Sequence, residues 1–381
     1  MENKIPVILI TGYLGAGKTT LLNELLQQEE RKVALIVNDI GSVNIDAKLL
    51  KQGNIAGMDT NVVELSNGCI CCTLREEFME QIDEISKCSN AEIIFVEASG
   101  VSDPSSIAEA FLVHEQTHED LLFFLDTVIT VVDADRVHSE FLYELEGKTK
   151  DDEEKISANE DVDIINLVMD QIEFCNVIVL NKCDLLGEEE LTKVEKVLKR
   201  LQSSANIIRS IHGKVKIEDL LNDEPFDFEE VLGGSAIQRA LAHAEIEDED
   251  EEEYGITSFV FEARNPLIRE KFMDFINNDY PMNIIRAKGY IWFSDDDVHV
   301  QLFEQAGRNA VVSKMSNWVA SLSAEEQKNV FEEYPEVRDD WDEVYGDRMI
   351  QIVFIGKNID KEHISAKISE CIHGEEQWKD L

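Results

Sequence analysis

Residues 7–26 carry an apolar strand-like run, a glycine-rich loop and a helical pattern in immediate succession. The loop, Gly12-Tyr13-Leu14-Gly15-Ala16-Gly17-Lys18-Thr19, has the spacing G-x-x-x-x-G-K-T, and Leu21 to Leu26 follow with helical periodicity. Glycines let backbone N–H groups close around a phosphate, and the positive end of the helix dipole favours the same anion. This order of elements predicts a nucleotide-binding domain of the α/β class.

Apolar runs alternate with helical patterns up to about residue 222, which is typical of a largely parallel sheet. Each run ends in a polar residue, and in such a sheet the carboxyl ends of the strands open onto a ligand crevice. We therefore expect an α/β fold in which a P-loop NTPase domain with a mainly parallel sheet precedes a smaller α+β domain. Strands are predicted at Val7 to Thr11, Val33 to Asn38, Ile93 to Glu97, Thr127 to Asp133 and Val177 to Asn181.

An acidic run separates two parts of the chain. From Glu245 to Glu253 every residue except Ile246 is acidic. Like charges repel and keep a segment extended, so the run is interpreted as a solvated linker, with a weak metal-attracting tether as the alternative. The predicted domains are residues 1–232, a linker at 233–254 and a second domain at 255–381. In the second domain, strands are predicted at 256–263, 284–293 and 349–355, and helices at 269–276 and 361–371.

The charge balance excludes several classes of function. The chain has 35 Lys and Arg against 79 Asp and Glu, a net charge of −44 over 381 residues. Sequence-independent nucleic-acid binding and anionic membrane surfaces both require clustered basic residues, so neither is an expected partner. No apolar run approaches the roughly 18 residues needed to cross a bilayer. Seven cysteines, an odd number, favour free thiols and a cytoplasmic protein.

The chemistry of the nucleotide follows from residue types at three places. Lys18 is expected to reach the β- and γ-phosphates, and the Thr19 hydroxyl to bind Mg²⁺. Glu97, at the end of a predicted strand, is the expected second Mg²⁺ ligand, directly or through water, and the Gly100 N–H can sense the γ-phosphate. Lys18 and Glu97 are therefore candidate catalytic residues.

Asn181-Lys182-Cys183-Asp184 ends another predicted strand and has the N-K-x-D form of a guanine reader. A carboxylate there can accept from the guanine ring N–H and the exocyclic amine, a donor pair that adenine lacks. Ser210 to Gly213 is a second candidate for base contacts, with an ordinary turn as the alternative. The complete predicted nucleotide-binding set is Gly12, Gly15, Ala16, Gly17, Lys18, Thr19, Thr20, Gly100, Asn181, Lys182 and Asp184.

Three thiols crowd into four positions at Cys69, Cys71 and Cys72. Thiolates at this spacing can meet one soft or borderline cation, since Zn²⁺ accepts Cys sulfur at about 2.3 Å in tetrahedral geometry. Fewer than four protein ligands would leave the site open to exchange. The alternatives are a buried loop of small residues and a redox C-x-x-C pair. The pattern favours a transition-metal site.

His114-Glu115-Gln116-Thr117-His118 matches H-E-x-x-H, in which two histidines share a helical face. The segment leads directly toward a predicted strand of the nucleotide domain. It is therefore interpreted as an exposed polar helix end, with an auxiliary metal contact or a zinc-protease site as the alternatives.

The chain resembles the CobW family of P-loop GTPases, which is itself similar to the GTPases that mature urease and hydrogenase. The segments that carry the resemblance are Leu9 to Asn23, the C-x-C-C at Cys69 to Cys72, Glu97-Ala98-Ser99-Gly100, Asn181 to Asp184, Arg286 to Trp292 and Gly346 to Gly356. They extend over nearly the whole chain, so a CobW-type C-terminal domain is implied as well.

The resemblance implies a GTP-hydrolysing metallochaperone that delivers a transition metal, most often Zn²⁺ and in some relatives Co²⁺, to a client metalloprotein. It implies that Cys69, Cys71 and Cys72 bind this metal. Family members usually have Asn-Glu-x-Gly-Glu after the second strand, where this chain has Asn38-Asp39-Ile40-Gly41-Ser42. Asp39 keeps a carboxylate and is the third candidate catalytic residue, whereas Ser42 lacks one; Asp46 retains the following acid. The segment from Asp39 to Asp46 is the candidate nucleotide-sensing switch.

Two other functions compete with this one. An activator dedicated to one metalloenzyme, of the nitrile-hydratase type with cobalt or iron, would differ only in metal and client. A passive metal-binding or storage module would need no working nucleotide site, which the intact Lys18, Thr19, Glu97 and Asp184 disfavour. Similar GTPases of the wider superclass often form homodimers, and the sequence specifies no interface.

Overall fold

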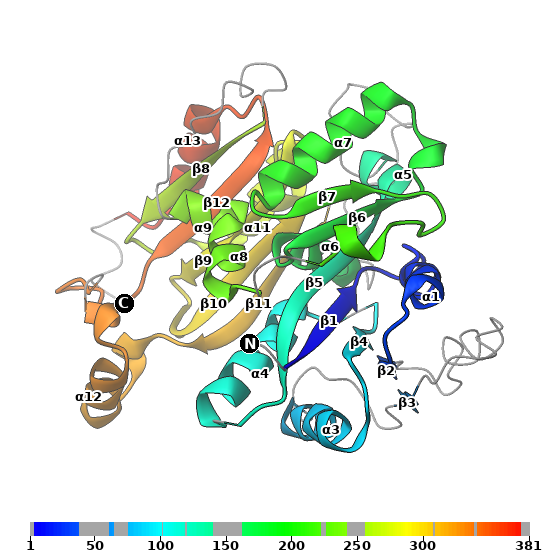
Figure 1. Cartoon of the computed structure of the whole chain (residues 1–381). Coiled ribbons are helices and arrows are strands. Elements are labelled where there is room, and N and C mark those ends of the chain that lie inside the picture. The colour runs from blue at the N-terminus through cyan, green and yellow to red at the C-terminus, as the bar shows by residue number, and fades with distance from the viewer. Residues whose placement is uncertain are drawn as a thin grey trace. The chain divides into compact units, whose positions relative to one another are not determined.

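The computed structural model describes residues 4–37, 61–64, 75–100, 102–118, 120–139, 162–221, 226–241, 256–307, 309–338 and 341–374. The chain divides into two compact units (Figure 1). The first comprises Met1–Leu142 and Leu167–Gln238, and the second Tyr143–Asn166 and Arg239–Leu381. The predicted boundaries at residues 232 and 254 stay a prediction. No helix among the described residues is long and apolar enough to span a membrane.

The first unit is built on a seven-stranded parallel sheet in the order β3-β2-β4-β1-β5-β6-β7. β1 lies at its centre, paired with β4 on one side and β5 on the other. These inner strands are apolar along their whole length because helices cover both faces of a parallel sheet. The strands are β1 Ile5–Thr11, β2 Val33–Val37, β3 Asn61–Glu64, β4 Ile93–Glu97, β5 Phe123–Asp133, β6 Val177–Asn181 and β7 Asn206–Arg209.

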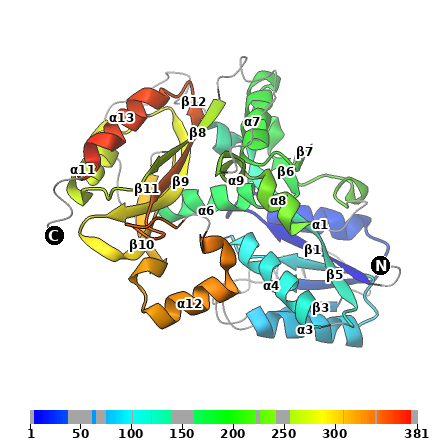
Figure 2. The same cartoon turned by 90° about the vertical axis from the view of Figure 1, so that its left-hand side faces the viewer.

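Helices pack on the sheet through apolar stripes. α1 buries Leu21, Leu22, Leu25 and Leu26 in a core shared with β1, β2, β4, β5 and β6. α3 and α4 lie side by side (Figure 2), and Phe78 of α3 meets Phe111 of α4 edge to face. The helices of this unit are α1 Lys18–Gln28, α3 Arg75–Cys88, α4 Pro104–Thr117, α5 Ala134–Val137, α6 Val162–Glu173, α7 Glu188–Leu201, α8 Phe228–Gly234 and α9 Ala236–Leu241, with short 3₁₀ turns η3 Cys183–Leu185 and η4 Ile217–Asp219. The first residues of α6 and the last of α9 are grouped with the second unit.

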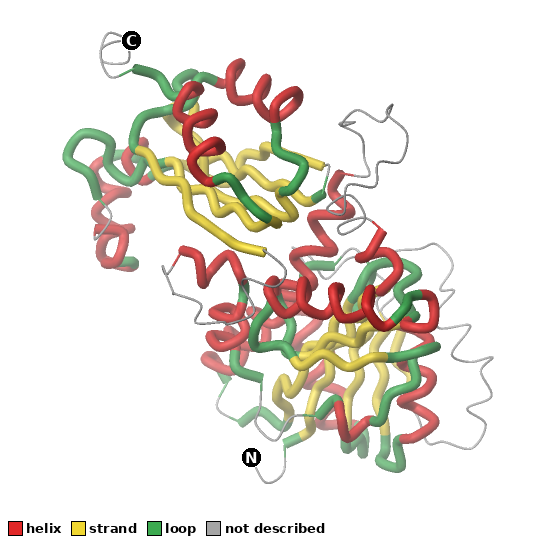
Figure 3. The backbone as a smooth tube through the Cα atoms, turned by 90° about the horizontal axis from the view of Figure 1, so that it is seen from above, coloured by secondary structure: helices red, strands yellow, loops and turns green. Residues whose placement is uncertain are grey.

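The second unit is a five-stranded antiparallel sheet in the order β11-β10-β9-β12-β8. Figure 3 shows in each unit a yellow sheet with red helices beside it. Phenylalanines at 259, 261, 272, 275, 293, 303 and 354 fill the core between this sheet and its helices. The elements are β8 Ile256–Ala263, β9 Ile284–Phe293, β10 Asp296–Ala306, β11 Asn309–Asn317, β12 Ile350–Lys357, α11 Arg269–Asp274, the π-helical turn η5 Phe275–Asp279, η6 Val319–Ser321, α12 Ala324–Glu333, η7 Pro335–Arg338 and α13 Lys361–Cys371.

The predicted fold class is confirmed, and most predicted elements lie where the sequence placed them. β5 differs, because it begins at Phe123 and not at Thr127. Val7 of β1 pairs with Leu125, and the next residue, Ile8, pairs with Thr127. Asp126 is therefore an extra residue in β5, as in a β-bulge, and the strand continues on both sides of it. The hairpin of β10 and β11 and the helix α12 were not predicted. Charged and amide side chains interrupt the apolar alternation of these strands, which hides their period.

Candidate nucleotide site

The predicted nucleotide-binding residues gather at the carboxyl edge of the seven-stranded sheet. The glycine-rich loop follows β1, Glu97 ends β4, and Asn181 ends β6. β5 lies between β1 and β6 and ends at Asp133 on the same edge. Parallel strands bring these ends together because they all run in one direction.

The loop depends on glycine at two close approaches. Gly12 has φ +133°, and a Cβ atom there would lie 2.4 Å from the Val131 carbonyl oxygen. Gly17 has φ +112°, and its Cβ would lie 2.3 Å from the Asn181 side-chain nitrogen. Any other residue would be strained by the positive φ and would collide with its neighbour. Gly15 has φ +81° with open space around it.

Lys18 begins α1 and is almost fully buried. Its Nζ donates to the Gly12 carbonyl oxygen at 2.7 Å and lies 3.4 Å from that of Tyr13. The ammonium is therefore held against the glycine-rich loop, where a phosphate would be neutralised by it.

The Thr19 hydroxyl donates to Glu97 Oε1 at 2.9 Å. Glu97 is only 2% exposed, although it is an acid at the end of a buried strand. A hydroxyl and a carboxylate held side by side are hard oxygen donors of the kind that Mg²⁺ takes, usually with water and phosphate oxygens as its other ligands. The donor set therefore fits Mg²⁺.

The loop after β4 is fastened by a residue that was not predicted from the sequence. Gln171 on α6 is 1% exposed, and its Nε2 donates to the Ser102 carbonyl oxygen at 3.0 Å and lies 3.4 Å from that of Gly100. Gly100 in turn packs on the phosphate loop, since a Cβ there would lie 2.9 Å from the Leu14 nitrogen and 3.4 Å from Lys18 Nζ. Gln171 thus sets where the Gly100 backbone lies beside the phosphate loop.

Asn181 links the base-reading segment to two other loops. Its Nδ2 donates to the Ala16 carbonyl oxygen at 2.9 Å, and its Oδ1 accepts from the Gly213 N–H at 3.1 Å. Asn181 therefore acts within the described structure as a brace between the phosphate loop and the 210–213 turn. That turn has left-handed backbone at His212 and Gly213, and a Cβ on Gly213 would lie 2.7 Å from the Leu21 nitrogen.

Lys182 and Asp184 frame the place predicted for the base. Lys182 has φ 60°, and its Nζ pairs with Asp133 Oδ2 at 2.5 Å. Asp184 is exposed in η3, so its carboxylate is accessible to a ligand. Asp133 was predicted only as a strand end; its side chain also caps α5 by accepting from the Arg136 N–H at 3.2 Å. The guanidinium of Arg136 lies 4.2 Å from the ring centre of Tyr13 in the phosphate loop.

For two of the remaining predicted residues the structure gives a position and a burial, and the others lie outside the part of the chain that it describes. Ala16 is buried in the loop, and Thr20 is exposed on α1. Asp39, Asp46 and the cysteines at 69, 71 and 72 lie outside the described residues. The described part of the chain contains no group of three or more His, Cys, Asp and Glu that could hold a metal ion.

His114 and His118 stack at 4.0 Å between ring centres at the end of α4. The pKa of His114 is lowered by burial and by the nearby His118. Because the described residues supply no third ligand to this pair, the zinc-protease alternative has no support there. The segment is a helix end, as interpreted from the sequence.

Both units match families of known proteins. Residues 6–209 match the family described as CobW/HypB/UreG, nucleotide-binding domain, and residues 256–372 match the cobalamin synthesis protein CobW C-terminal domain. The chain is 33% identical to the zinc-regulated GTPase metalloprotein activator 1 of Dictyostelium discoideum, over 97% of this chain and 80% of that protein. It is 28% identical to the zinc chaperone YjiA of Escherichia coli, over 96% and 98%.

The chain is also similar to a solved structure. The Zn(II)-bound YjiA GTPase from E. coli is 21% identical over 97% of this chain and 100% of its own, with a TM-score of 0.41.

Proposed function

Because this chain belongs to the CobW/HypB/UreG family, we propose that it hydrolyses GTP and uses the nucleotide cycle to bind Zn²⁺ and deliver it to a client metalloprotein. The observation that supports this best is the Thr19–Glu97 contact at 2.9 Å, beside the buried ammonium of Lys18. These groups are the ones that phosphoryl transfer from a Mg²⁺-bound nucleotide requires. Zn²⁺ is the proposed metal because the relatives are named as a zinc-regulated GTPase activator and as zinc chaperones.

Each residue of the nucleotide site has a proposed role in GTP hydrolysis. Lys18 neutralises charge on the β- and γ-phosphates, and the Gly100 N–H, positioned through Gln171, donates to the γ-phosphate. Thr19 and Glu97 would hold Mg²⁺, which supplies further neutralisation of the phosphate charge. Asp184 accepts from the guanine N–H groups. Asp39 is proposed to position the attacking water from the segment that precedes Asp46.

The metal is a substrate of this cycle and binds to Cys69, Cys71 and Cys72. Thiolates bind Zn²⁺ only after losing their protons, so the affinity depends on nearby charge, including that of the bound nucleotide. The GTP-bound form is proposed to hold the ion and the GDP-bound form to release it. A ligand can drive such a change only if it contacts the two states differently. Co²⁺ is the alternative cargo.

The partners that this function requires are GTP and the client protein. The net charge of −44 disfavours nucleic acid and anionic membranes as partners. The cytoplasm is the proposed location because glutathione and thioredoxin keep thiols reduced there.

The decisive experiment measures Zn²⁺ affinity with GDP and with a non-hydrolysable GTP analogue. At least about tenfold tighter binding with the analogue is expected, a coupling of about 1.4 kcal/mol. Cys71→Ser should weaken binding, whereas Cys88→Ser, which changes an exposed thiol on α3, should not. Equal affinities in the two nucleotide states would refute the coupling, and absence of GTP turnover with Zn²⁺, Co²⁺ and Ni²⁺ would favour a passive metal-binding module.

A further inference from the structure

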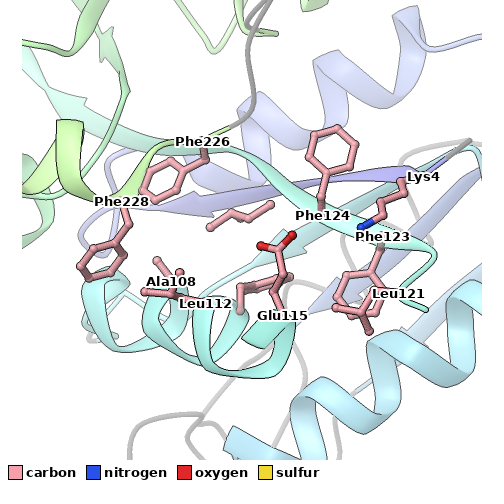
Figure 4. A pocket seen from close by; sticks show the side chains of 11 residues that line it. Lys4, Ala108, Leu112, Glu115, Leu121, Phe123, Phe124, Phe226 and Phe228 are labelled. Carbon is pink, nitrogen blue, oxygen red and sulfur yellow. The ribbon is translucent and has the colours of Figure 1, made fainter. Parts of the chain in front are cut away.

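An apolar pocket of about 200 Å³ lies at the amino edge of the seven-stranded sheet (Figure 4). We call it the amino-edge pocket. Its walls come from α4, the first residues of β5, the segment before α8 and the first residue of α8. The side chains that define it are Phe111, Leu112, Phe123, Phe124, Phe226 and Phe228. It lies at the opposite edge of the sheet from the nucleotide site, since Lys4 precedes β1 and Phe123 begins β5.

The pocket is open to solvent on an apolar surface. Leu112 is 36% exposed in its wall, and Leu122 nearby is 42% exposed. Its two charged lining residues are Lys4 and Glu115, and neither forms an ion pair within the described structure. Figure 4 shows Glu115 between the Phe226–Phe228 end of the pocket and Lys4. Exposed apolar surface that is also concave is characteristic of a binding site.

A second cavity, of about 630 Å³, continues the amino-edge pocket along the same edge. The two share Leu112, Phe226 and Phe228. The second cavity also has three exposed acids in its wall, Asp227, Glu229 and Glu230. No basic side chain pairs with these acids among the residues that the structure describes. The combined surface therefore has an apolar half and an acidic half.

We propose that this surface binds a short segment of a partner protein in which bulky apolar side chains are followed by Lys or Arg. The apolar side chains enter the amino-edge pocket, and the basic residues lie against Asp227, Glu229 and Glu230. Acidic charge is spread widely over this chain, so charge alone would not choose this place. The phenylalanine-lined pocket does, because buried apolar anchors contribute most of the energy of such contacts. The acids add specificity and speed of association.

The surface lies at the amino edge of the sheet and the nucleotide site at the carboxyl edge, so the two can be occupied independently. A segment bound at the amino edge leaves the phosphate loop at the carboxyl edge open. The partner can therefore stay bound while nucleotide exchanges, and its binding does not depend on the function proposed above.

The test uses the full chain and three fluorescein-labelled peptides in an anisotropy titration. The first has two Phe and one Leu followed by a run of Lys, the second has Glu in place of Lys, and the third has Ser in place of Phe and Leu. The first peptide is expected to bind with a Kd on the order of 10 μM, and the other two at least about tenfold more weakly. Raising the salt to about 1 M should weaken the first peptide, since screening acts on the exposed acids.

Point variants test whether the first peptide binds at this surface. Leu112→Asp should weaken the first peptide at least about tenfold, whereas Val113→Asp, one residue along α4 and outside the pocket, should not. Glu229→Lys should weaken it severalfold, whereas Glu325→Lys, also an exposed acid in the first turn of a helix, should not.

Three results would overturn the proposal. The first is equal binding of the basic and acidic peptides, or no saturation by the basic peptide below about 1 mM. The second is equal effects of Leu112→Asp and Val113→Asp. The third is a dimer, detected by light scattering, that Leu112→Asp dissociates, because a second copy of the chain would then cover the pocket.

Discussion

The side-chain nitrogen of Gln171 lies 3.0 Å from the carbonyl oxygen of Ser102, joining α6 to the loop that follows β4. The same nitrogen lies 3.4 Å from the Gly100 carbonyl oxygen, so one buried amide holds two carbonyls of a loop that packs on the phosphate loop. A buried donor with two acceptors fixes its neighbours more firmly than an exposed one, because breaking these bonds leaves unsatisfied polar groups.

Gln171→Leu is predicted to lower kcat for GTP hydrolysis by about tenfold while changing the Kd for GDP by less than about threefold, since the Gly100 N–H is proposed to contact the γ-phosphate, which GDP lacks. Single-turnover hydrolysis and GDP binding measure the two quantities. Gln202→Leu is the matched control, because Gln202 is an equally buried glutamine that donates to the Glu173 and Val231 carbonyls away from the site. Equal losses of kcat in both variants would show a general effect on stability.

Thr19→Val is predicted to raise the Mg²⁺ concentration required for half-maximal hydrolysis by more than tenfold and to lower kcat by roughly 100-fold. The change keeps the shape of the side chain and removes the hydroxyl that contacts Glu97. Thr19→Ser restores a hydroxyl and should retain most activity. A Mg²⁺ titration of the hydrolysis rate checks this, and an unchanged Mg²⁺ requirement in Thr19→Val would remove Thr19 from the metal site.

Gly17→Ala is predicted to abolish GTP binding, whereas Gly15→Ala should weaken it far less. Both positions have positive φ, so each substitution costs about 1 kcal/mol in backbone strain. Only at Gly17 does the new Cβ also collide with another residue, at 2.3 Å from the Asn181 side chain. Binding of a fluorescent GTP analogue and thermal melting compare the two. Similar affinities would mean that the loop can move away from Asn181.

Asp184→Asn is predicted to weaken GTP binding by about 100-fold and to improve binding of xanthosine triphosphate. The carboxylate can only accept hydrogen bonds, which suits the N–H groups of guanine, whereas an amide can also donate to the carbonyl that xanthine carries in place of the amine. Competition between the two nucleotides for the labelled analogue measures the shift. A uniform loss for both would contradict a direct role in base reading.

Asp296 should make the stability of the second unit depend on acid pH. Burial alone would raise the pKa of its carboxyl, but hydrogen bonds from His299 and the Lys314 ammonium lower the pKa to about 2. Because the folded pKa lies below the ordinary value of 3.8, the stabilisation is complete above about pH 4 and is lost as the pH falls toward 2.

Asp296→Asn is therefore expected to lower the free energy of unfolding by about 1 kcal/mol at pH 7 and by progressively less below pH 4. Urea unfolding at several pH values measures this. Asp297→Asn, at the exposed neighbouring position, is the control and should change little. A difference that stayed constant down to pH 2 would exclude the carboxylate as its source.

Much of the nucleotide site was predictable because its residues are close in sequence or end a strand. The spacing of Gly12, Gly17, Lys18 and Thr19 places them on one turn and the start of one helix. Glu97 and Asn181 end apolar strands, and parallel strands place their ends on one edge. The sequence also predicts a base reader at Asn181 and Asp184, and this role stays a prediction. It did not predict that Asn181 braces the phosphate loop and Gly213.

Part of the second domain, the hairpin of β10 and β11 and the helix α12, could not be predicted from the sequence. Strand β10 begins with Asp296-Asp297-Val298-His299, and its alternation is weak. It is a strand because Phe303 and its neighbours pair with β9 and bury an aromatic core. β-propensity depends on such neighbours more than on the residues themselves.

The sequence by itself determined the order of strand, loop and helix and the chemistry of the groups at each strand end, since both are local properties of the chain. Only the tertiary structure decided that Gln171 holds Gly100, that Asp133 pairs with Lys182, and that Leu112 meets Phe226 and Phe228 in one pocket. Each of these contacts joins segments between about 50 and 120 residues apart. Helical or strand periodicity tells which face of an element is buried, but the partner on that face depends on how the elements pack.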